Sequence, residues 1–171
     1  MKKGKPILYK IYYGDVLVYL GRTNQPLQTR LHGHFFKKPM HRVLDINMVT
    51  KIEYAEFSTV ADMYLYEIYY INRLKPSLNV DDRARDEITV TLPEVPFKQF
   101  DCPLMDKWKK EIAERENEWT KLREEYIEIP QKISVLRRQH RDGEIDEDEY
   151  WEAIDALHDR QKQLQKELYG C

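Results

Sequence analysis

Apolar residues in the second half of the chain recur at alternating spacings of three and four, which constrains that half to long amphipathic helices. The first apolar seam consists of Ile112, Trp119, Leu122, Tyr126, Ile129, Ile133 and Leu136, with Arg115 as its polar member. The second seam consists of Tyr150, Ile154, Leu157, Gln161, Leu164 and Leu168. Between the seams, 142–143 (Asp-Gly) predicts a turn, and Asp146 with Glu149 resembles a capping box. The pattern therefore predicts an α-helical hairpin or coiled coil over residues 104–171.

Two features of this helical region leave its structure and role open. Pro130 lies inside the first predicted helix, and we expect it to kink or break the helix unless a new helix starts there. The two apolar seams can pair with each other in antiparallel fashion or with another copy of the chain. We therefore expect an assembly or targeting role, with a homodimer or higher oligomer as one outcome.

Residues 1–92 follow a different pattern, which predicts a small α+β domain. Strand-forming residues over 7–13 and 16–20 flank a two-residue link, Gly14-Asp15, and predict a β-hairpin. A helix is expected from Leu27 to Phe35, a third strand over 51–57, and a helix capped by Ser58 or Thr59 that runs to Leu74. A final strand is possible over 88–92. We expect a central antiparallel three-stranded sheet flanked by helices.

Residues 93–103 separate the two predicted regions. They contain Pro93, Pro96 and Pro103 and show little periodicity. Proline disfavours continued helix and regular strand pairing, so this composition predicts a linker. The domain organisation expected from the sequence is thus 1–92, 93–103 and 104–171.

The charge is distributed unevenly over the chain. Residues 1–85 contain 14 Lys+Arg and 8 Asp+Glu, whereas residues 86–171 contain 14 and 22. The positive first half is compatible with a phosphate-bearing partner, and the acidic second half is a poor general DNA-binding surface. No apolar run approaches the ~20 residues needed to span a bilayer, so we expect no membrane partner. Cys102 and Cys171 make neither a disulfide framework nor a four-ligand zinc site, which favours an intracellular, cytoplasmic location.

Glu67 is the first candidate for chemistry. It is the one charged residue in the apolar and aromatic segment 63–71. Such a carboxylate either points to water or has a partner, because burying it unpaired costs several kcal/mol. One interpretation is a solvated stripe on the helix. The other is a ligand for Mg²⁺, which prefers oxygen donors and often uses only one or two carboxylates.

The order of several further residues resembles the GIY-YIG nuclease family over about residues 7–80. The matching residues are Tyr9, Tyr19-Leu20-Gly21, Arg22, Arg30, His34, Glu67 and Asn79. The first motif reads Ile7-Leu8-Tyr9 and lacks the usual glycine. A second register, Lys10-Ile11-Tyr12, makes Tyr12 the alternative first-motif tyrosine. We favour Tyr9, because its separation of ten residues from Tyr19 is closer to the family's spacing.

This resemblance implies a metal-dependent endonuclease that hydrolyses DNA phosphodiester bonds to 5′-phosphate and 3′-hydroxyl ends. Glu67 would hold one Mg²⁺, with Mn²⁺ able to substitute. Tyr19, or Tyr9 beside it, would act as the general base, and Arg30 would hold the phosphate. Supporting positions in the family correspond to Arg22, His34 and Asn79. The expected partner is DNA, most simply duplex DNA.

Two other functions remain open at this point. One is a catalytically silent binding or assembly module of the same fold, which acts through its C-terminal helices. The intact set of Tyr9, Tyr19, Arg30 and Glu67 argues against it, since a binding module does not need that combination. The other is a ribonuclease or structure-selective nuclease in the same fold. The family is frequent in phages and mobile elements, which weakly favours such a source.

Overall fold

The computed structural model describes residues 4–37 and 44–170 of the 171-residue chain. The chain divides into two compact units, with the boundary between Met105 and Asp106. The first unit is α+β and the second consists of helices. Cys171 lies outside the described residues.

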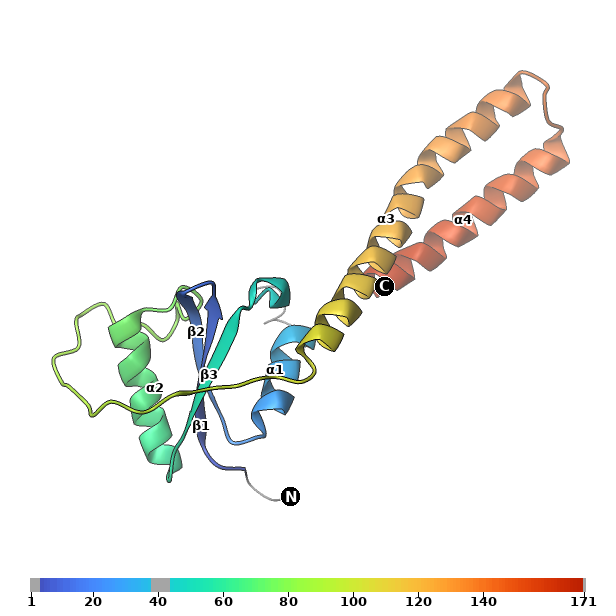
Figure 1. Cartoon of the computed structure of the whole chain (residues 1–171). Helices are drawn as coiled ribbons and strands as arrows, with labels where there is room; N and C mark the ends of the chain where they lie inside the picture. The colour runs from blue at the N-terminus through green and yellow to red at the C-terminus, as the bar shows by residue number, and fades with distance from the viewer. Residues whose placement is uncertain (1–3, 38–43, 171) are drawn as a thin grey trace. The chain divides into compact units, whose positions relative to one another are not determined.

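The first unit is built on a four-stranded antiparallel sheet with the strand order β2-β1-β3-β4, of which Figure 1 labels β1, β2 and β3. The strands are β1 (Ile7–Tyr13), β2 (Val16–Thr23), β3 (Lys51–Glu56) and β4 (Lys98–Gln99). Gly14, with φ of +58°, forms the tight turn between β1 and β2 as predicted. The predicted number of three strands is wrong, because β4 pairs with β3 from within the predicted linker. Two residues of extended chain suffice for this pairing, and such a short strand leaves no sequence pattern.

The possible strand over 88–92 is also wrong. These residues have no regular secondary structure, although their apolar side chains are used for packing. Ile88, Leu92, Val95 and Phe97 pack against the buried cluster that α2 forms with the sheet. Their β-branched and apolar character therefore reflects burial of side chains and not pairing with a neighbouring strand.

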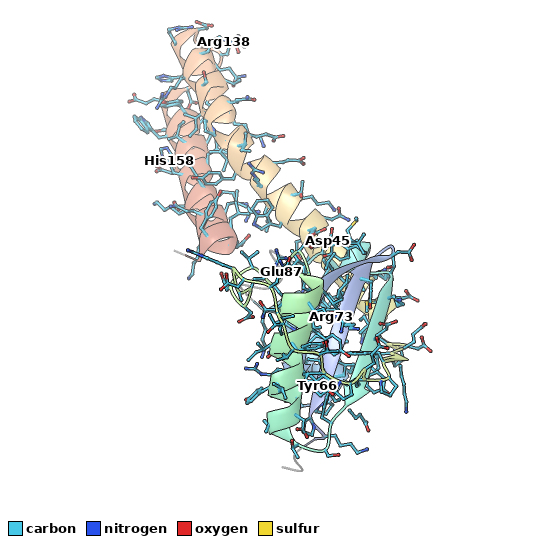
Figure 2. All side chains as sticks on the ribbon, turned by 90° about the vertical axis from the view of Figure 1, so that its left-hand side faces the viewer. Asp45, Tyr66, Arg73, Glu87, Arg138 and His158 are labelled. Carbon is cyan, nitrogen blue, oxygen red and sulfur yellow. The ribbon has the colours of Figure 1, made fainter. Side chains whose placement is uncertain are left out.

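Two helices cover opposite faces of the sheet (Figure 1): α1 (Leu27–Phe36) and α2 (Val60–Leu74). The start of α2 is capped as predicted, because the Thr59 hydroxyl accepts a hydrogen bond from the Asp62 N–H. The helix ends at Lys75, which adopts a left-handed conformation with φ of 48°. Tyr66 and Arg73 mark the course of α2 in Figure 2. A short 3₁₀ helix, η2 (Ile46–Met48), precedes β3.

The core follows from the alternation of side chains along β1 and β2. Even-numbered Leu8 and Leu20 face α2 and pack in one cluster with Tyr69, Tyr70 and Ile71. Odd-numbered Tyr9 faces α1, where its hydroxyl meets side chains of that helix. Alternate residues of β1 and β2 therefore face α1 and α2.

The second unit is a hairpin of α3 (Met105–Arg141) and α4 (Glu147–Tyr169) (Figure 1). As predicted, a turn with Gly143 at φ of +76° follows α3, and the Asp146 carboxylate accepts a hydrogen bond from the Glu149 N–H at the start of α4. Arg160 holds Glu125 through two hydrogen bonds of 2.7 Å and thereby joins the two helices. None of the described helices is long and apolar enough to cross a membrane.

Of the expected kink or break at Pro130, the break is wrong, because α3 runs through this residue as one continuous helix. Proline removes one backbone hydrogen bond and crowds the preceding turn. Here 25 helical residues precede Pro130 and 11 follow it. The neighbouring Ile129 is 1% exposed, so burial of apolar side chains stabilises the helix on the turn where the hydrogen bond is lost.

Candidate active site

A pocket of about 400 Å³ lies at the outer edge of β2 and collects side chains from both faces of the sheet. We call it the β2-edge pocket. Its lining residues are Tyr19, Arg22, Thr23, Asn24, Gln25, Arg30, Met63, Tyr64, Glu67 and Asp82. Tyr19 and Arg30 come from the side of α1, whereas Arg22 and Glu67 come from the side of α2. Because β2 is an edge strand, one opening can reach both sets.

Behind Tyr19, three side chains form a connected cluster. The Tyr9 hydroxyl is hydrogen-bonded to Nε2 of His34. The same hydroxyl accepts a hydrogen bond of 3.3 Å from Nε of Arg30. The ring of Tyr19 packs edge-on against His34, with 5.2 Å between the ring centres, and lies 6.1 Å from the ring of Tyr9. The structure thus brings together four residues that the sequence singled out.

The absence of a side chain at Gly21 leaves room for the rings of Tyr9 and Tyr19. It lies opposite Tyr9 in the β1–β2 register. A Cβ atom at this position would lie 2.7 Å from the Tyr9 hydroxyl and 2.7 Å from a ring carbon of Tyr19. Side chains do not approach a Cβ so closely, so the packing of both rings depends on glycine.

The surroundings of this cluster keep Tyr9, Tyr19 and His34 neutral beside the charged Arg30. Burial raises the pKa of Tyr9, with Tyr19 adding to the effect, whereas the charge of Arg30 opposes it. Burial likewise raises the pKa of Tyr19, and Arg30 and Tyr9 act in the opposite direction. Burial and the neighbouring charge of Arg30 lower the pKa of His34 to about 4. His34 is therefore a neutral imidazole at pH 7 and can accept the Tyr9 proton in their hydrogen bond.

On the opposite side of the pocket, Glu67 forms an ion pair with Arg22. The Glu67 side chain is 11% exposed and that of Arg22 is 42% exposed. The Arg22 guanidinium also stacks 4.0 Å above the ring of Tyr64. The interpretation of Glu67 as a freely solvated stripe does not fit this environment, because the carboxylate is largely buried and paired.

The residues of the pocket fit a divalent cation with few protein ligands. Glu67 offers a hard carboxylate oxygen, and the exposed Asp82 supplies a second carboxylate to the same lining. Mg²⁺ commonly takes one or two carboxylates and completes its shell with water and substrate phosphate. Among the described residues there is no cluster of three or more His, Cys, Asp or Glu placed to hold a metal ion. Arg22 binds an oxygen of Glu67, so Arg22 and a cation would compete for the same carboxylate.

Asn79 orders the strand that carries Tyr19. Its side-chain oxygen accepts a hydrogen bond of 2.8 Å from the Leu20 N–H, and its side-chain nitrogen donates one of 2.8 Å to the Leu20 carbonyl. The Leu78 N–H donates to the Val18 carbonyl at 2.8 Å. The segment after α2 therefore binds the free edge of β2 on both sides of Tyr19.

Tyr12, the alternative first-motif tyrosine, does not join this cluster. Its hydroxyl donates to the Glu53 carboxylate on β3 at 2.7 Å. Tyr9 and Tyr12 are three residues apart on one strand, so their side chains point to opposite faces of the sheet. The structure places only Tyr9 of these two beside Tyr19, His34 and Arg30.

Tyr64 and Asp82 are pocket residues that were not singled out from the sequence. Tyr64 stacks on Arg22, and Asp82 lines the pocket from the loop after Asn79. Tyr64 is one turn before Glu67 on α2, so helical spacing could have indicated a shared face. Asp82 has no such signal, because the path of the loop decides its position.

Comparisons of the chain with protein-family models, with curated proteins and with solved structures found no match.

Proposed function

We propose that the chain is a metal-dependent endonuclease that hydrolyses DNA phosphodiester bonds and leaves 5′-phosphate and 3′-hydroxyl ends. One observation carries this proposal: Tyr19, Arg30 and Glu67 reach the same pocket from three different elements. Phosphodiester hydrolysis needs a proton acceptor for water, a cationic group on the phosphate and help for the departing oxygen. The residue order that resembles the GIY-YIG family supports the same reaction.

Tyr19 is the group of the tyrosine pair that meets the attacking water. It lines the pocket, whereas Tyr9 is fully buried behind it. A phenol with a raised pKa is a weak base at neutral pH, so its phenolate needs stabilisation. Arg30 lies against the pair and favours the phenolate of each tyrosine. Tyr9 and His34 form a buried hydrogen-bonded extension that orients Arg30 and the ring of Tyr19.

Arg30 and Arg22 supply the positive charge for the phosphate. Arg30 donates a hydrogen bond from Nε to Tyr9 and also lines the pocket, and its guanidinium is a planar fork of donors suited to phosphate oxygens. The Arg22 side chain is more than two-fifths exposed, and it can bind a phosphate oxygen when it leaves Glu67. Residues 1–85 contain 14 Lys+Arg and 8 Asp+Glu, and this net positive charge attracts a polyanion such as DNA.

Glu67 would hold one Mg²⁺, or Mn²⁺ in its place, and such an ion neutralises charge on the scissile phosphate and on the leaving oxygen. The ion pair with Arg22 holds the Glu67 carboxylate at the lining of the pocket. Asp82, at the same lining, is available as a second oxygen donor.

Cleavage of supercoiled plasmid tests the proposal. Wild-type protein should nick or linearise the plasmid with Mg²⁺ and not with EDTA, and Glu67→Ala should be inactive. Glu56→Ala is the matched control, because Glu56 is an exposed β3 carboxylate that pairs with Lys5 away from the pocket. End-labelling of the products should show 5′-phosphates.

The same assay with branched DNA and with RNA separates the alternative substrates. Preference for branched DNA or for RNA would replace the duplex-DNA assignment by a structure-selective nuclease or a ribonuclease. If wild type and Glu67→Ala were equally inert on all three substrates, the endonuclease would be abandoned in favour of a binding module.

A further inference from the structure

The α3–α4 hairpin has an apolar groove along one side. This groove has a volume of about 690 Å³ and is open to solvent over much of its length. We call it the hairpin groove. Its lining residues are Glu128, Gln131, Lys132, Val135, Leu136, Gln139, Ala153, Ala156 and Leu157. The α3 members recur at helical spacing, so they form a continuous stripe on the surface of the hairpin.

Packing inside the hairpin does not cover this stripe. Ile129, Ile154 and Leu164 are buried between or along the helices, at 4% exposure or less. Val135 in the groove is 46% exposed, and Leu136 and Leu157 are half-buried. Two helices share one seam, so apolar residues beside that seam remain open unless a further surface packs on them.

The charges of the groove restrict what can cover it. The groove contains one acid and one base, Glu128 and Lys132, which form an i,i+4 ion pair of 3.0 Å. Residues 106–171 as a whole contain 13 Lys+Arg and 18 Asp+Glu, so the net negative charge disfavours nucleic acid as the occupant. The occupant must instead be an apolar surface with balanced charges. The hairpin groove itself meets this description.

We propose that a second copy of this chain docks on the hairpin groove, so that two hairpins form a four-helix bundle. A twofold arrangement uses the same patch on both copies, and it can set Glu128 of one copy against Lys132 of the other. Ala153 and Ala156 have small side chains and allow close approach of the opposing helix. Figure 2 shows the side chains along both helices, with Arg138 near the turn of the hairpin and His158 on α4.

The length of the hairpin is sufficient for a stable interface. The 23 residues of α4 span about 35 Å, and the facing part of α3 is as long. A standard interface uses about 20–30 residues on each side. One face of each of two helices of this length supplies about that number. If the proposed function holds, the dimer carries two active sites and can cut both strands of one duplex.

The mass of the full-length chain in solution tests the dimer. Light scattering coupled to gel filtration at micromolar concentration should give twice the monomer mass of 20.7 kDa. Val135→Glu should halve the measured mass, because it places a charge in the centre of the groove. Ser134→Glu is the matched control: it adds the same charge one residue away on an exposed part of α3 outside the groove, and it should leave the dimer intact.

Two further measurements make the outcome decisive. Far-ultraviolet circular dichroism should show equal helix content in Val135→Glu and Ser134→Glu. Ala156→Glu, a substitution on α4 alone, should also abolish the dimer. A monomeric wild type at high micromolar concentration would overturn the proposal, as would a dimer that survives both groove variants. Glu67→Ala should remain dimeric, so loss of nuclease activity and loss of assembly are separate results.

Discussion

Arg22 and Glu67 join β2 to α2 through an ion pair between residues 45 positions apart, and this pair forms one wall of the β2-edge pocket. Stacking on Tyr64 fixes the guanidinium from its other side. The acid that the sequence presents as an isolated charge in an apolar helix is therefore bound by a strand that lies far from it in the chain.

Removal of Arg22 should destabilise the first unit. Arg22→Gln leaves a largely buried carboxylate without its cation, and we expect a loss of about 1–2 kcal/mol, reduced from a fully buried pair because Arg22 is partly exposed. The double variant Arg22→Gln/Glu67→Gln should recover much of the loss. Urea denaturation of the wild type, the single variants Arg22→Gln and Glu67→Gln, and the double variant gives the coupling energy. A coupling near zero would show that the pair is not formed in solution.

Tyr19→Phe should abolish most nuclease activity while the fold is kept. Loss of a positioned proton acceptor typically costs 10²–10⁴-fold in rate, so nicking should fall by at least about 100-fold. Tyr12→Phe is the control, because the Tyr12 hydroxyl bonds to Glu53 on β3 and lies apart from the cluster. Single-turnover nicking rates measure both. Full activity of Tyr19→Phe would show that Tyr19 is not the proton acceptor for the attacking water.

The buried His34 should make stability depend on pH. Its pKa is about 4 in the folded protein and near 6.5 when the chain is unfolded, so the unfolded state binds more protons between these values. The free energy of unfolding should therefore fall as pH decreases from about 7 to 4, by about 3 kcal/mol from this residue. His34→Gln keeps a hydrogen-bond acceptor and does not titrate. Urea denaturation across this range should show a steeper fall for wild type, and parallel curves would contradict the assignment.

Asn79→Ala should loosen β2 locally. It removes both hydrogen bonds to the Leu20 backbone, and Asn79 is 6% exposed, so we expect a loss of about 2 kcal/mol. Amide hydrogen exchange at Leu20 should accelerate more than exchange at core positions of β1. Ser77→Ala, an exposed position in the same segment, should leave both quantities unchanged. Unaltered exchange at Leu20 would show that Asn79 does not hold the strand.

Local signals in the sequence predicted much of the first unit. The turn at Gly14, the cap at Thr59 and the helix end near Leu74 each depend on residues within a few positions, and the structure confirms them. β4 and the path of residues 88–97 depend on contacts with strands and helices far away in the chain. No nearby residue pattern indicates such contacts. The sequence therefore predicted a linker where the structure has β4, and a possible strand over 88–92 where the structure has partly buried side chains without strand pairing.

The candidate site shows the same division. Tyr9, Tyr19, Arg30 and His34 lie on a hairpin and the helix that follows it, so spacing alone could place them near each other. The partner of Glu67 could not be predicted, because it depends on where α2 crosses β2. The choice between Tyr9 and Tyr12 was open in the sequence. Their spacing places them on opposite faces of the strand, but only the contacts in the fold show that Tyr9 is the one beside His34 and Arg30.

The hydrogen bonds of Leu78 and Asn79 to β2 have a consequence for behaviour at high concentration. An exposed strand edge offers unpaired N–H and C=O groups to other chains and promotes aggregation. Leu78 and Asn79 occupy these groups on one side of the sheet, and at the other side β4 is only two residues long. Among the described residues, neither edge thus presents a long template for strand addition, and we expect the sheet to resist growth into fibrils even where many copies of the chain are crowded together.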